Sequence, residues 1–303
     1  MKEMSAAADD LVLLVEVVEA GGFSAASARC GIPKSRLSRR IARLEQQLGM
    51  PLIKRDSRHF EVTDVGRQLL EHGARIRESA RSALTAAQDS LGQPTGDLRV
   101  ACPVALATTL LARFAAGFVQ RYPLVRLSVV TTTGRVESLA DRYDIVIHPT
   151  SVPLADTSMV ARPMLMSRFV LVSAPGAVEP VDDPRALSQR NVIGWDYMGA
   201  SDRWRLTHED GRSVDVVVSP RLSSDNLLVL REAVLAGWGV APMATLMCAA
   251  DVAAGRLQIV APGWAPPPAQ LYAVYGSRRT LSVAGRAFIE GFEGFLREVY
   301  GVV

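Results

Sequence analysis

The sequence KSRLSRRIARLEQQL, from Lys34 to Leu48, decides the fold of the N-terminal part of this chain. Its apolar residues recur at intervals of four, three and four positions, at Leu37, Ile41, Leu44 and Leu48. At about 100° of rotation per residue, this spacing forms one apolar stripe along a helix. The other side carries small, hydroxyl and cationic residues, namely Ser35, Arg36, Ser38, Arg39, Ala42 and Arg43. The stretch therefore predicts a helix that buries one face and presents arginines and hydroxyls on the other.

Two shorter helices are predicted before this one. Apolar periodicity places the first over residues 9–19, and the second spans residues 25–30 with Ser24 as its N-cap. Gly31 can adopt the left-handed conformation that ends a helix, and Pro33 favours the start of the next one. Two helices joined by a tight turn with glycine form a helix-turn-helix, whose second helix enters the major groove of DNA.

The charge distribution favours nucleic acid as the partner of this module. Residues 29–58 hold nine basic and two acidic residues, whereas the whole chain of 303 residues has a formal net charge of only +3. A basic segment beside a mildly acidic remainder is typical of a nucleic-acid-binding module on a body that does not bind. Within the helix, arginine and lysine can pair with guanine, and serine with either type of base.

The residues around these helices resemble the LysR-type transcriptional regulators over residues 1–66. The matching segments are FSAAS at 23–27, IPKSRLSRRI at 32–41, LExxLGxPLIxR at 44–55 and TDxG at 63–66. Lys34 stands where glutamine is usual in the family and Arg36 where alanine is usual, which implies a different operator but the same function.

The resemblance also implies a wing after the third helix, over residues 50–62. Arg55 and Arg58 then lie near its tip, where arginine contacts phosphate or a narrow minor groove. The alternative for each arginine is a solubilising role or an ion pair with Asp56. The predicted DNA-binding residues are Ser24, Lys34, Ser35, Arg36, Ser38, Arg39, Arg43, Arg55 and Arg58.

A long helix is predicted from Asp64 to about residue 91, with Thr63 as its cap. Mostly small residues recur at intervals of four and three positions, at Leu69, Gly73, Ile76, Ala80, Ala83 and Ala87. Such a heptad seam favours pairing with the same helix of a second chain, and the alternative is packing on its own body. The resemblance implies a homodimer or homotetramer formed through this helix. Residues 92–96 are predicted to be a hinge.

From residue 97 the pattern changes to alternating strands and helices. We predict strands at 98–102, 125–131, 144–148, 168–174, 192–195, 214–218, 239–242, 257–260 and 271–275, and helices at 104–121, 135–142, 183–187, 225–236 and 283–299. Such βαβ repetition implies parallel sheets that are covered by helices on both sides. Two extended crossings, near residues 162–163 and 266–270, predict two lobes with a cleft. The pattern resembles the effector-binding domain of LysR-type regulators, which is similar to periplasmic solute-binding proteins.

The predicted fold class is therefore α/β with three parts. A winged helix-turn-helix, all-α with a small wing, covers residues 1–66, and a linker and dimerisation helix covers residues 67–92. A two-lobed effector-binding domain covers residues 93–303. Its first lobe takes residues 97–161 and 270–303, and its second lobe takes residues 162–269.

The candidate effector site follows from a general rule of open α/β sheets. Ligands bind outside the carboxyl ends of the strands, near helix N-termini. The candidates are Cys102, Pro103, Val104, Ala105, Thr131, Thr132, Thr133, His148, Trp195, Ser223, Ser224 and Gly239. Helix N-termini favour an anion, so an organic acid is the expected effector. His148 stands where the family often has arginine, and Ala105 lies near a common serine, so a larger or less charged effector stays open.

Other classes of function find little support in the sequence. There is no Walker loop, dinucleotide fingerprint or histidine pair, so we expect no enzyme activity, no cofactor and no metal. The alternative function is thiol-based redox sensing, because Cys102 lies near a helix N-terminus that can lower its pKa, while Cys248 lies in the other lobe.

Three cysteines and no long apolar run or secretory leader favour the cytoplasm and no membrane association. The expected partners are double-stranded operator DNA, a small-molecule effector and further copies of the chain, with RNA polymerase as an open alternative.

Overall fold

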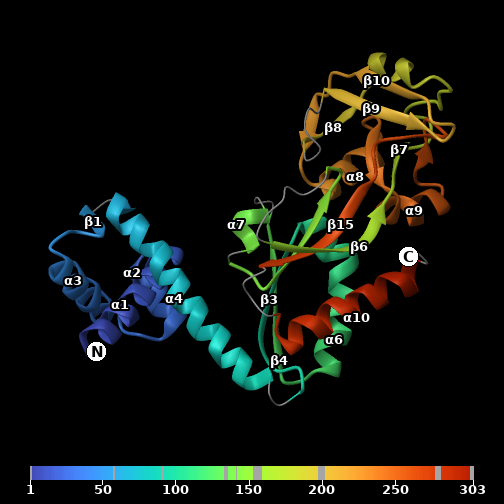
Figure 1. The fold of residues 1–303 in the computed structure, drawn as a ribbon. Coiled ribbons are helices and arrows are strands. Elements are labelled where there is room, and N and C mark those ends of the chain that lie inside the picture. The colour runs from blue at the N-terminus through green and yellow to red at the C-terminus, as the bar shows by residue number, and fades with distance from the viewer. Residues whose placement is uncertain are drawn as a thin grey trace. The chain divides into compact units, whose positions relative to one another are not determined.

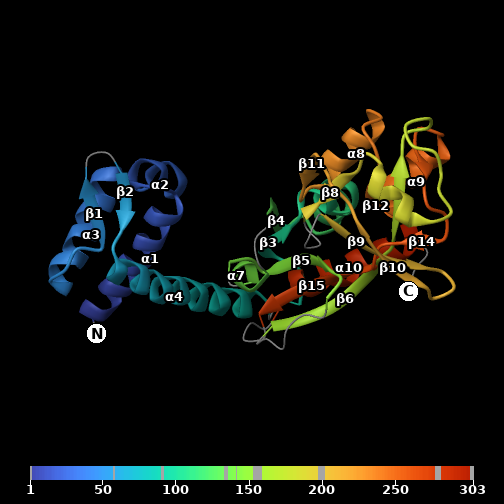
Figure 2. The same cartoon turned by 90° about the horizontal axis from the view of Figure 1, so that it is seen from above.

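The computed structural model describes residues 2–56, 59–89, 92–132, 136–140, 142–152, 159–196, 202–276 and 281–300. The chain divides into two compact units, Met1–Ser90 and Leu91–Val303, which are called the DNA-binding unit and the effector-binding unit below. Figures 1 and 2 show the elements within each unit.

The DNA-binding unit is a three-helix module followed by a hairpin and a long helix. Its elements are α1 (Lys2–Glu19), α2 (Phe23–Cys30), α3 (Lys34–Leu48), β1 (Ile53–Asp56), β2 (His59–Val62) and α4 (Asp64–Asp89). The bounds of α3 agree with the prediction because its apolar stripe is strictly periodic: Leu37, Ile41 and Leu44 are all buried. Gly31 ends α2 in the left-handed conformation, with φ of 69°.

The prediction that Ser24 caps the second helix is wrong. The helix begins one residue earlier, at Phe23, and its N-cap is Gly22, which makes no side-chain cap. Ser24 is therefore an exposed residue of the first turn. The cap predicted for the linker helix is confirmed, because the Thr63 hydroxyl accepts a hydrogen bond of 3.0 Å from the Gly66 amide.

The first half of α4 packs on its own unit. This agrees with the alternative to pairing with the same helix of a second chain. Leu69 packs against the core of the three-helix module, and Gly73 is buried. A Cβ atom on Gly73 would lie 2.5 Å from the Leu11 carbonyl oxygen and 2.8 Å from Val15 Cγ2. Only glycine allows α1 and α4 to approach this closely. The exposed part of the seam begins later in α4, at Ala80 and Ala83.

The first lobe of the effector-binding unit contains a five-stranded sheet in the order β4-β3-β5-β15-β6. Its elements are β3 (Gly96–Cys102), α5 (Val104–Leu106), η1 (Ala107–Leu111), α6 (Ala112–Arg121), β4 (Val125–Thr131), α7 (Val136–Ala140), β5 (Ile145–Thr150), β6 (Met159–Ser167), β15 (Ala269–Gly276) and α10 (Val283–Tyr300). Strand β3 pairs with β4 and β5 in parallel, whereas β15 is antiparallel to β5 and β6. The predicted parallel sheet is thus a mixed sheet.

Alternation along the strands explains how helices cover both faces of this sheet. Leu98, Val100 and Cys102 pack with α6 and α10, while Ala101 on β3 packs with α7. The aromatic rings of Phe114 on α6 and Phe288 on α10 meet edge to face, with centroids 5.1 Å apart. Figure 1 shows α6 and α10 beside one another on the same lobe.

The second lobe is built from three small sheets, with strand orders β10-β9-β14, β11-β8 and β12-β7-β13. Its elements are β7 (Phe169–Ser173), η2 (Pro184–Gln189), β8 (Ile193–Trp195), β9 (Arg203–His208), β10 (Ser213–Val217), β11 (Leu222–Ser224), α8 (Leu227–Leu235), β12 (Ala241–Ala244), α9 (Thr245–Ala253), β13 (Gln258–Ile259) and β14 (Trp264–Ala265). Among these named strands, only β8 and β11 pair in parallel. The parallel sheet expected here is therefore wrong as well.

Of the two predicted crossings between the lobes, the first is part of a longer paired strand, whereas residues 266–268 of the second form no strand and lead into β15. The segment predicted as an extended crossing near residues 162–163 lies inside β6, which pairs with β15 along its whole length. Strand β6 belongs to the first sheet, and β7 follows after Arg168. Arg162 also joins this lobe through an ion pair of 2.5 Å with Glu293 on α10.

Among the described residues, no single helix combines the length and the apolar character needed to cross a membrane. One pair, Ala6–Glu19 with Phe23–Cys30, passes such a test only jointly and is bent by 111°.

Candidate DNA-binding surface and effector pocket

Three cationic side chains form the outer face of α3. Lys34, Arg36 and Arg39 are exposed and form no ion pair with the residues that the structure describes. The guanidinium Nε of Arg39 donates a hydrogen bond of 3.2 Å to the Ser35 carbonyl, which leaves its terminal nitrogens available. Ser35 is exposed and Ser38 half-buried beside them. This face can offer cations and hydroxyls to phosphates or base edges.

Two further arginines of α3 are engaged by a buried carboxylate. Asp10 on α1 is 0% exposed, and Arg40 and Arg43 each hydrogen-bond to a different one of its oxygens. The Arg43 Nη2 to Asp10 Oδ2 distance is 2.7 Å. Arg43, a predicted DNA-binding residue, is therefore attached to α1, although its side chain is 51% exposed. Asp10 is not among the residues predicted from the sequence.

The wing is attached to α3 by a second carboxylate that the sequence analysis missed. Glu45 Oε1 accepts hydrogen bonds from the backbone amides of Leu52 and Ile53, at 2.9 and 3.1 Å. Within the wing, Lys54 forms an ion pair of 3.2 Å with Glu61 across the hairpin. The predicted tip residue Arg58 and the side chain of Arg55 lie outside the described residues.

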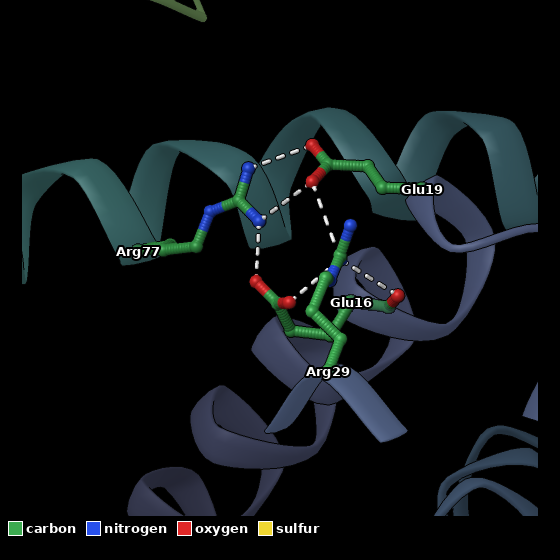
Figure 3. A network of polar contacts seen from close by, with 4 residues as sticks. All are labelled: Glu16, Glu19, Arg29 and Arg77. Carbon is green, nitrogen blue, oxygen red and sulfur yellow. Dashed lines mark hydrogen bonds and ion pairs between the residues drawn. The ribbon is translucent and has the colours of Figure 1, made fainter. Parts of the chain in front are cut away.

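An ion-pair network joins α4 to the helix-turn-helix (Figure 3). Arg77 on α4 contacts Glu16 and Glu19 on α1, each at 2.7 Å. Arg29 on α2 contacts the same carboxylates, at 2.7 Å to Glu16 and 3.7 Å to Glu19. The hydrogen bond that Arg77 donates to Glu19 is the main cause that raises the pKa of Arg77 above its ordinary value. The network fixes the direction in which α4 leaves the module, and it neutralises Arg29.

A cavity of about 120 Å³ lies between the two lobes of the effector-binding unit. The first lobe contributes residues of α5, η1, β5, β6 and β15, and the second contributes residues of β7, β8, α8, β12 and α9. The predicted site residues that line it are Pro103, Val104, Ala105 and Trp195. The Trp195 and Phe169 rings pack with centroids 4.9 Å apart. Predicted site residues from both lobes therefore line the same cavity.

The remaining predicted effector residues do not line this cavity. Six of them lie elsewhere in the effector-binding unit, namely Thr131, Thr132, His148, Ser223, Ser224 and Gly239. Thr133 lies outside the described residues. Gly239 is placed where a Cβ would lie 2.2 Å from the Asn191 carbonyl oxygen, which gives it a packing role. Cys102, at the end of β3, is part of the core of the first lobe, where its side chain packs with residues of α6.

Most of the apolar lining is absent from the residues predicted from the sequence. This lining includes Leu106, Leu110, Leu165, Phe169, Leu227, Ala244, Leu246, Met247 and Leu271, with the polar Thr109 among them. Thr109 and Leu110 lie about one turn after the predicted site residues Val104 and Ala105 on the same predicted helix. Residues four positions apart share a helix face, so this spacing could have predicted them as lining residues. The residues from α9 come from a helix whose position depends on the packing of the second lobe.

The polar groups of this cavity carry no positive charge. None of the described lining residues is lysine or arginine, and the single ionisable one is Asp225, at the exposed rim. The Thr109 hydroxyl donates a hydrogen bond of 2.6 Å to the Ala105 carbonyl, and the Asn226 side chain caps α8 through the Leu228 amide. A ligand here meets an apolar wall with few polar atoms, and no side-chain cation to pair with a carboxylate.

Cys102 and Cys248 do not have the environment expected of redox sensors. Burial raises the pKa of Cys102 to about 12 and that of Cys248 to about 11. The expectation that a helix N-terminus lowers the pKa of Cys102 is wrong, because its side chain lies in the core. Among the described residues there is also no group of three histidine, cysteine or acidic side chains that could hold a metal ion.

Comparison with known proteins identifies the two units separately. Residues 8–67 match the family model described as bacterial regulatory helix-turn-helix protein, lysR family. Residues 91–296 match the model described as LysR substrate binding domain. The chain is 30% identical over 289 residues to the HTH-type transcriptional regulator PtxR of Pseudomonas aeruginosa, covering 94% of this chain and 92% of that protein. It is 28% identical over 291 residues to the regulator CrgA of Neisseria meningitidis, covering 95% and 96%.

Solved structures agree with this fold. The structure of CrgA, a LysR-type transcriptional regulator from Neisseria meningitidis, matches with a TM-score of 0.59 at 27% identity, over 95% of this chain and 98% of that one. The full-length Vibrio cholerae virulence activator AphB has a similar fold, with a TM-score of 0.66 at 24% identity over 94% and 98%. With both units matched along nearly their whole length, the chain belongs to the LysR family of bacterial transcriptional regulators, with a helix-turn-helix for DNA and an effector-binding domain.

Proposed function

We propose that α3 reads the operator of this regulator through Lys34, Ser35, Arg36, Ser38 and Arg39. The observation that carries the proposal is the exposed triad of cations on α3, which has no acidic partner among the described residues. A recognition helix in the major groove uses such side chains for guanine edges and phosphates. Ser24 and the wing arginines Arg55 and Arg58 remain predicted phosphate contacts.

The test replaces the central cation of that face. The Arg39→Ala variant should lose operator preference, by about 1–3 kcal/mol of discrimination between operator and unrelated duplex. The operator is obtained by selection from random duplexes, and binding is followed by fluorescence anisotropy. Arg190→Ala, an exposed arginine of the effector-binding unit, is the control. Unchanged discrimination by Arg39→Ala would reject this reading surface.

We further propose that the cavity between the lobes holds an uncharged, largely apolar effector about the size of one aromatic ring. The cavity of about 120 Å³ is lined by Trp195, Phe169 and Met247, and it offers no side-chain cation among the described residues. An organic acid, the expectation from helix N-termini, would leave its charge poorly paired there. The apolar wall therefore favours the less charged alternative.

Matched ligands test this proposal. Benzaldehyde and phenol should raise the thermal unfolding midpoint of the protein more than benzoate does at the same concentration. An Ala105→Leu variant fills the cavity and should abolish that shift, whereas Ala112→Leu, on the exposed side of α6, should keep it. A larger shift with benzoate that Ala105→Leu removes would contradict the uncharged class of effector.

The remaining partners follow from the family. LysR regulators bind operator DNA and small molecules and oligomerise, and we propose a homodimer or homotetramer here, with the exposed α4 residues Ala80, Ala83 and Leu84 in the contact. RNA polymerase stays a predicted partner, the cytoplasm a predicted location, and a purely regulatory, non-enzymatic role the proposal for the chain.

A further inference from the structure

The five basic residues of α3 fall into two groups. Lys34, Arg36 and Arg39 are exposed, with no ion pair among the described residues, whereas Arg40 and Arg43 contact Asp10. Sequence alone places all five cations in one basic block, in which Glu45 is the nearest acid. The acid that divides them lies 30 residues before Arg40 and 33 before Arg43.

Both oxygens of the Asp10 carboxylate accept a hydrogen bond from an arginine. Its side chain is 0% exposed, while those of Arg40 and Arg43 are 26% and 51% exposed. Arg40 Nε donates to Oδ1, and Arg43 Nη2 donates to Oδ2 at 2.7 Å. A buried carboxylate needs such partners, since an unpaired buried charge is strongly destabilising. Water competes poorly for a carboxylate at such a depth, so the two guanidinium groups are held on the α1 side of α3.

We propose that Asp10 is a positioning residue for DNA recognition: it withholds Arg40 and Arg43 from the duplex and leaves the direct contacts of α3 to Lys34, Arg36 and Arg39. The inference rests on the proposed reading surface of α3. It removes Arg43 from the predicted DNA-binding residues. Its consequence is that two cations which would otherwise bind any phosphate backbone add little affinity for unspecific DNA.

The salt dependence of binding reports this role, whereas a merely structural role would not change it. Each phosphate contact contributes a slope of about 0.9 in the logarithm of the binding constant against the logarithm of salt concentration. In the full-length protein, Asp10→Asn frees two arginines at the edge of α3. We expect the slope on a duplex of mixed sequence to steepen by about one to two contacts, and the ratio of operator to mixed-sequence affinity to fall several-fold.

Two single variants keep the test decisive even if Asp10→Asn fails to fold. Arg39→Gln should flatten the slope by about one contact, whereas Arg43→Gln should leave it unchanged. Equal flattening by Arg43→Gln and Arg39→Gln would overturn the inference, as would a folded Asp10→Asn variant with the slope of the wild type. If neither Arg39→Gln nor Arg43→Gln changes binding, the proposed reading surface of α3 itself fails, which is a separate outcome.

Discussion

Among the described residues, each unit buries one aspartate beneath two arginines. In the DNA-binding unit the carboxylate is Asp10, 0% exposed, with Arg40 and Arg43. In the effector-binding unit it is Asp251, 2% exposed, with Arg231 at 2.7 Å and Arg256 at 2.6 Å. The first cluster joins α1 to a helix that presents further cations, and the second joins α9 to α8 and to the turn after α9.

The consequence of such an ion cluster therefore depends on the residues around it. Arg231 and Arg256, once freed from Asp251, would lie on the second lobe, where no DNA-reading role is predicted, so the loss of this carboxylate should affect folding alone. The arginines freed from Asp10 would join the cations of α3. Asp251→Asn is therefore the matched control for Asp10→Asn, and any change of DNA binding shared by both variants would point to a general loss of structure.

The largest expected effect comes from a second contrast between the units, the packing of their helices. In the DNA-binding unit, Gly73→Leu introduces a Cβ atom that would lie only 2.5 Å from the Leu11 carbonyl oxygen, so α1 and α4 must separate. We expect a loss of about 3 kcal/mol in the free energy of unfolding, measured by urea denaturation. In the effector-binding unit, a Cβ atom on Gly117 of α6 would meet no described atom within 4 Å.

Gly117→Ala is the control for this prediction. It should stabilise the protein by up to about 1 kcal/mol, because alanine is a better helix former than glycine. A Gly73→Leu variant as stable as the wild type would mean that α4 does not pack closely on α1. The contrast between the two helices would then disappear.

A smaller effect is expected for Asp251→Asn. The substitution leaves Arg231 and Arg256 without their carboxylate, and because both arginines are partly exposed we expect a loss of about 2 kcal/mol, below the range for fully buried pairs. Urea denaturation of the full chain measures it. The salt dependence of DNA binding should match that of the wild type, and a steeper slope would remove the contrast with Asp10.

The pH dependence of this loss follows from the pKa of Asp251. Burial raises the pKa, but hydrogen bonds from Arg256 and Arg231 outweigh burial and hold it below its usual value. The stabilisation is therefore fully present above the pKa of the unfolded chain, about 4, and is lost as the pH falls through the lower pKa of the folded state. The difference between wild type and Asp251→Asn should shrink below that pH. A difference that grows on acidification would contradict this sign.

Sequence patterns predicted the helices better than the contacts between distant segments. The stripe of α3 fixed its bounds, but β6 was missed because Pro163 and the charged Arg162 interrupt its alternation. Strand β14 has only two residues, which is too short for an alternating pattern to be recognised in the sequence. The cavity joins α5 and η1 to α9, a contact that depends on how the lobes close.

The buried position of Asp10, unlike these contacts, could have been predicted from the sequence. Asp10, Leu13, Leu14 and Val17 recur at intervals of three, one and three positions and are all buried. Asp10 therefore stands on the apolar stripe of α1, where an acid needs a cationic partner. The stripe indicates that a partner exists, but only the packing of α1 on α3 identifies Arg40 and Arg43.

The smallest expected effect contrasts the cysteines of the two units. Burial raises the pKa of Cys102 to about 12 and that of Cys248 to about 11, so both thiols stay protonated at pH 8. Both are buried, whereas Cys30 of the DNA-binding unit is half-buried. A thiol reagent at that pH should modify Cys30 first, and the other two only as the protein unfolds.

Because thiolates react with peroxide far faster than thiols do, operator binding should not respond to peroxide through Cys102 or Cys248. Gel-shift measurements on the wild type and on the double variant Cys102→Ser/Cys248→Ser test this, with Cys30→Ser to account for the more accessible thiol. Identical behaviour of wild type and double variant is expected. A peroxide response in the wild type that the double variant lacks, and that Cys30→Ser keeps, would show that the effector-binding unit opens far enough to expose these thiols and would restore the redox alternative.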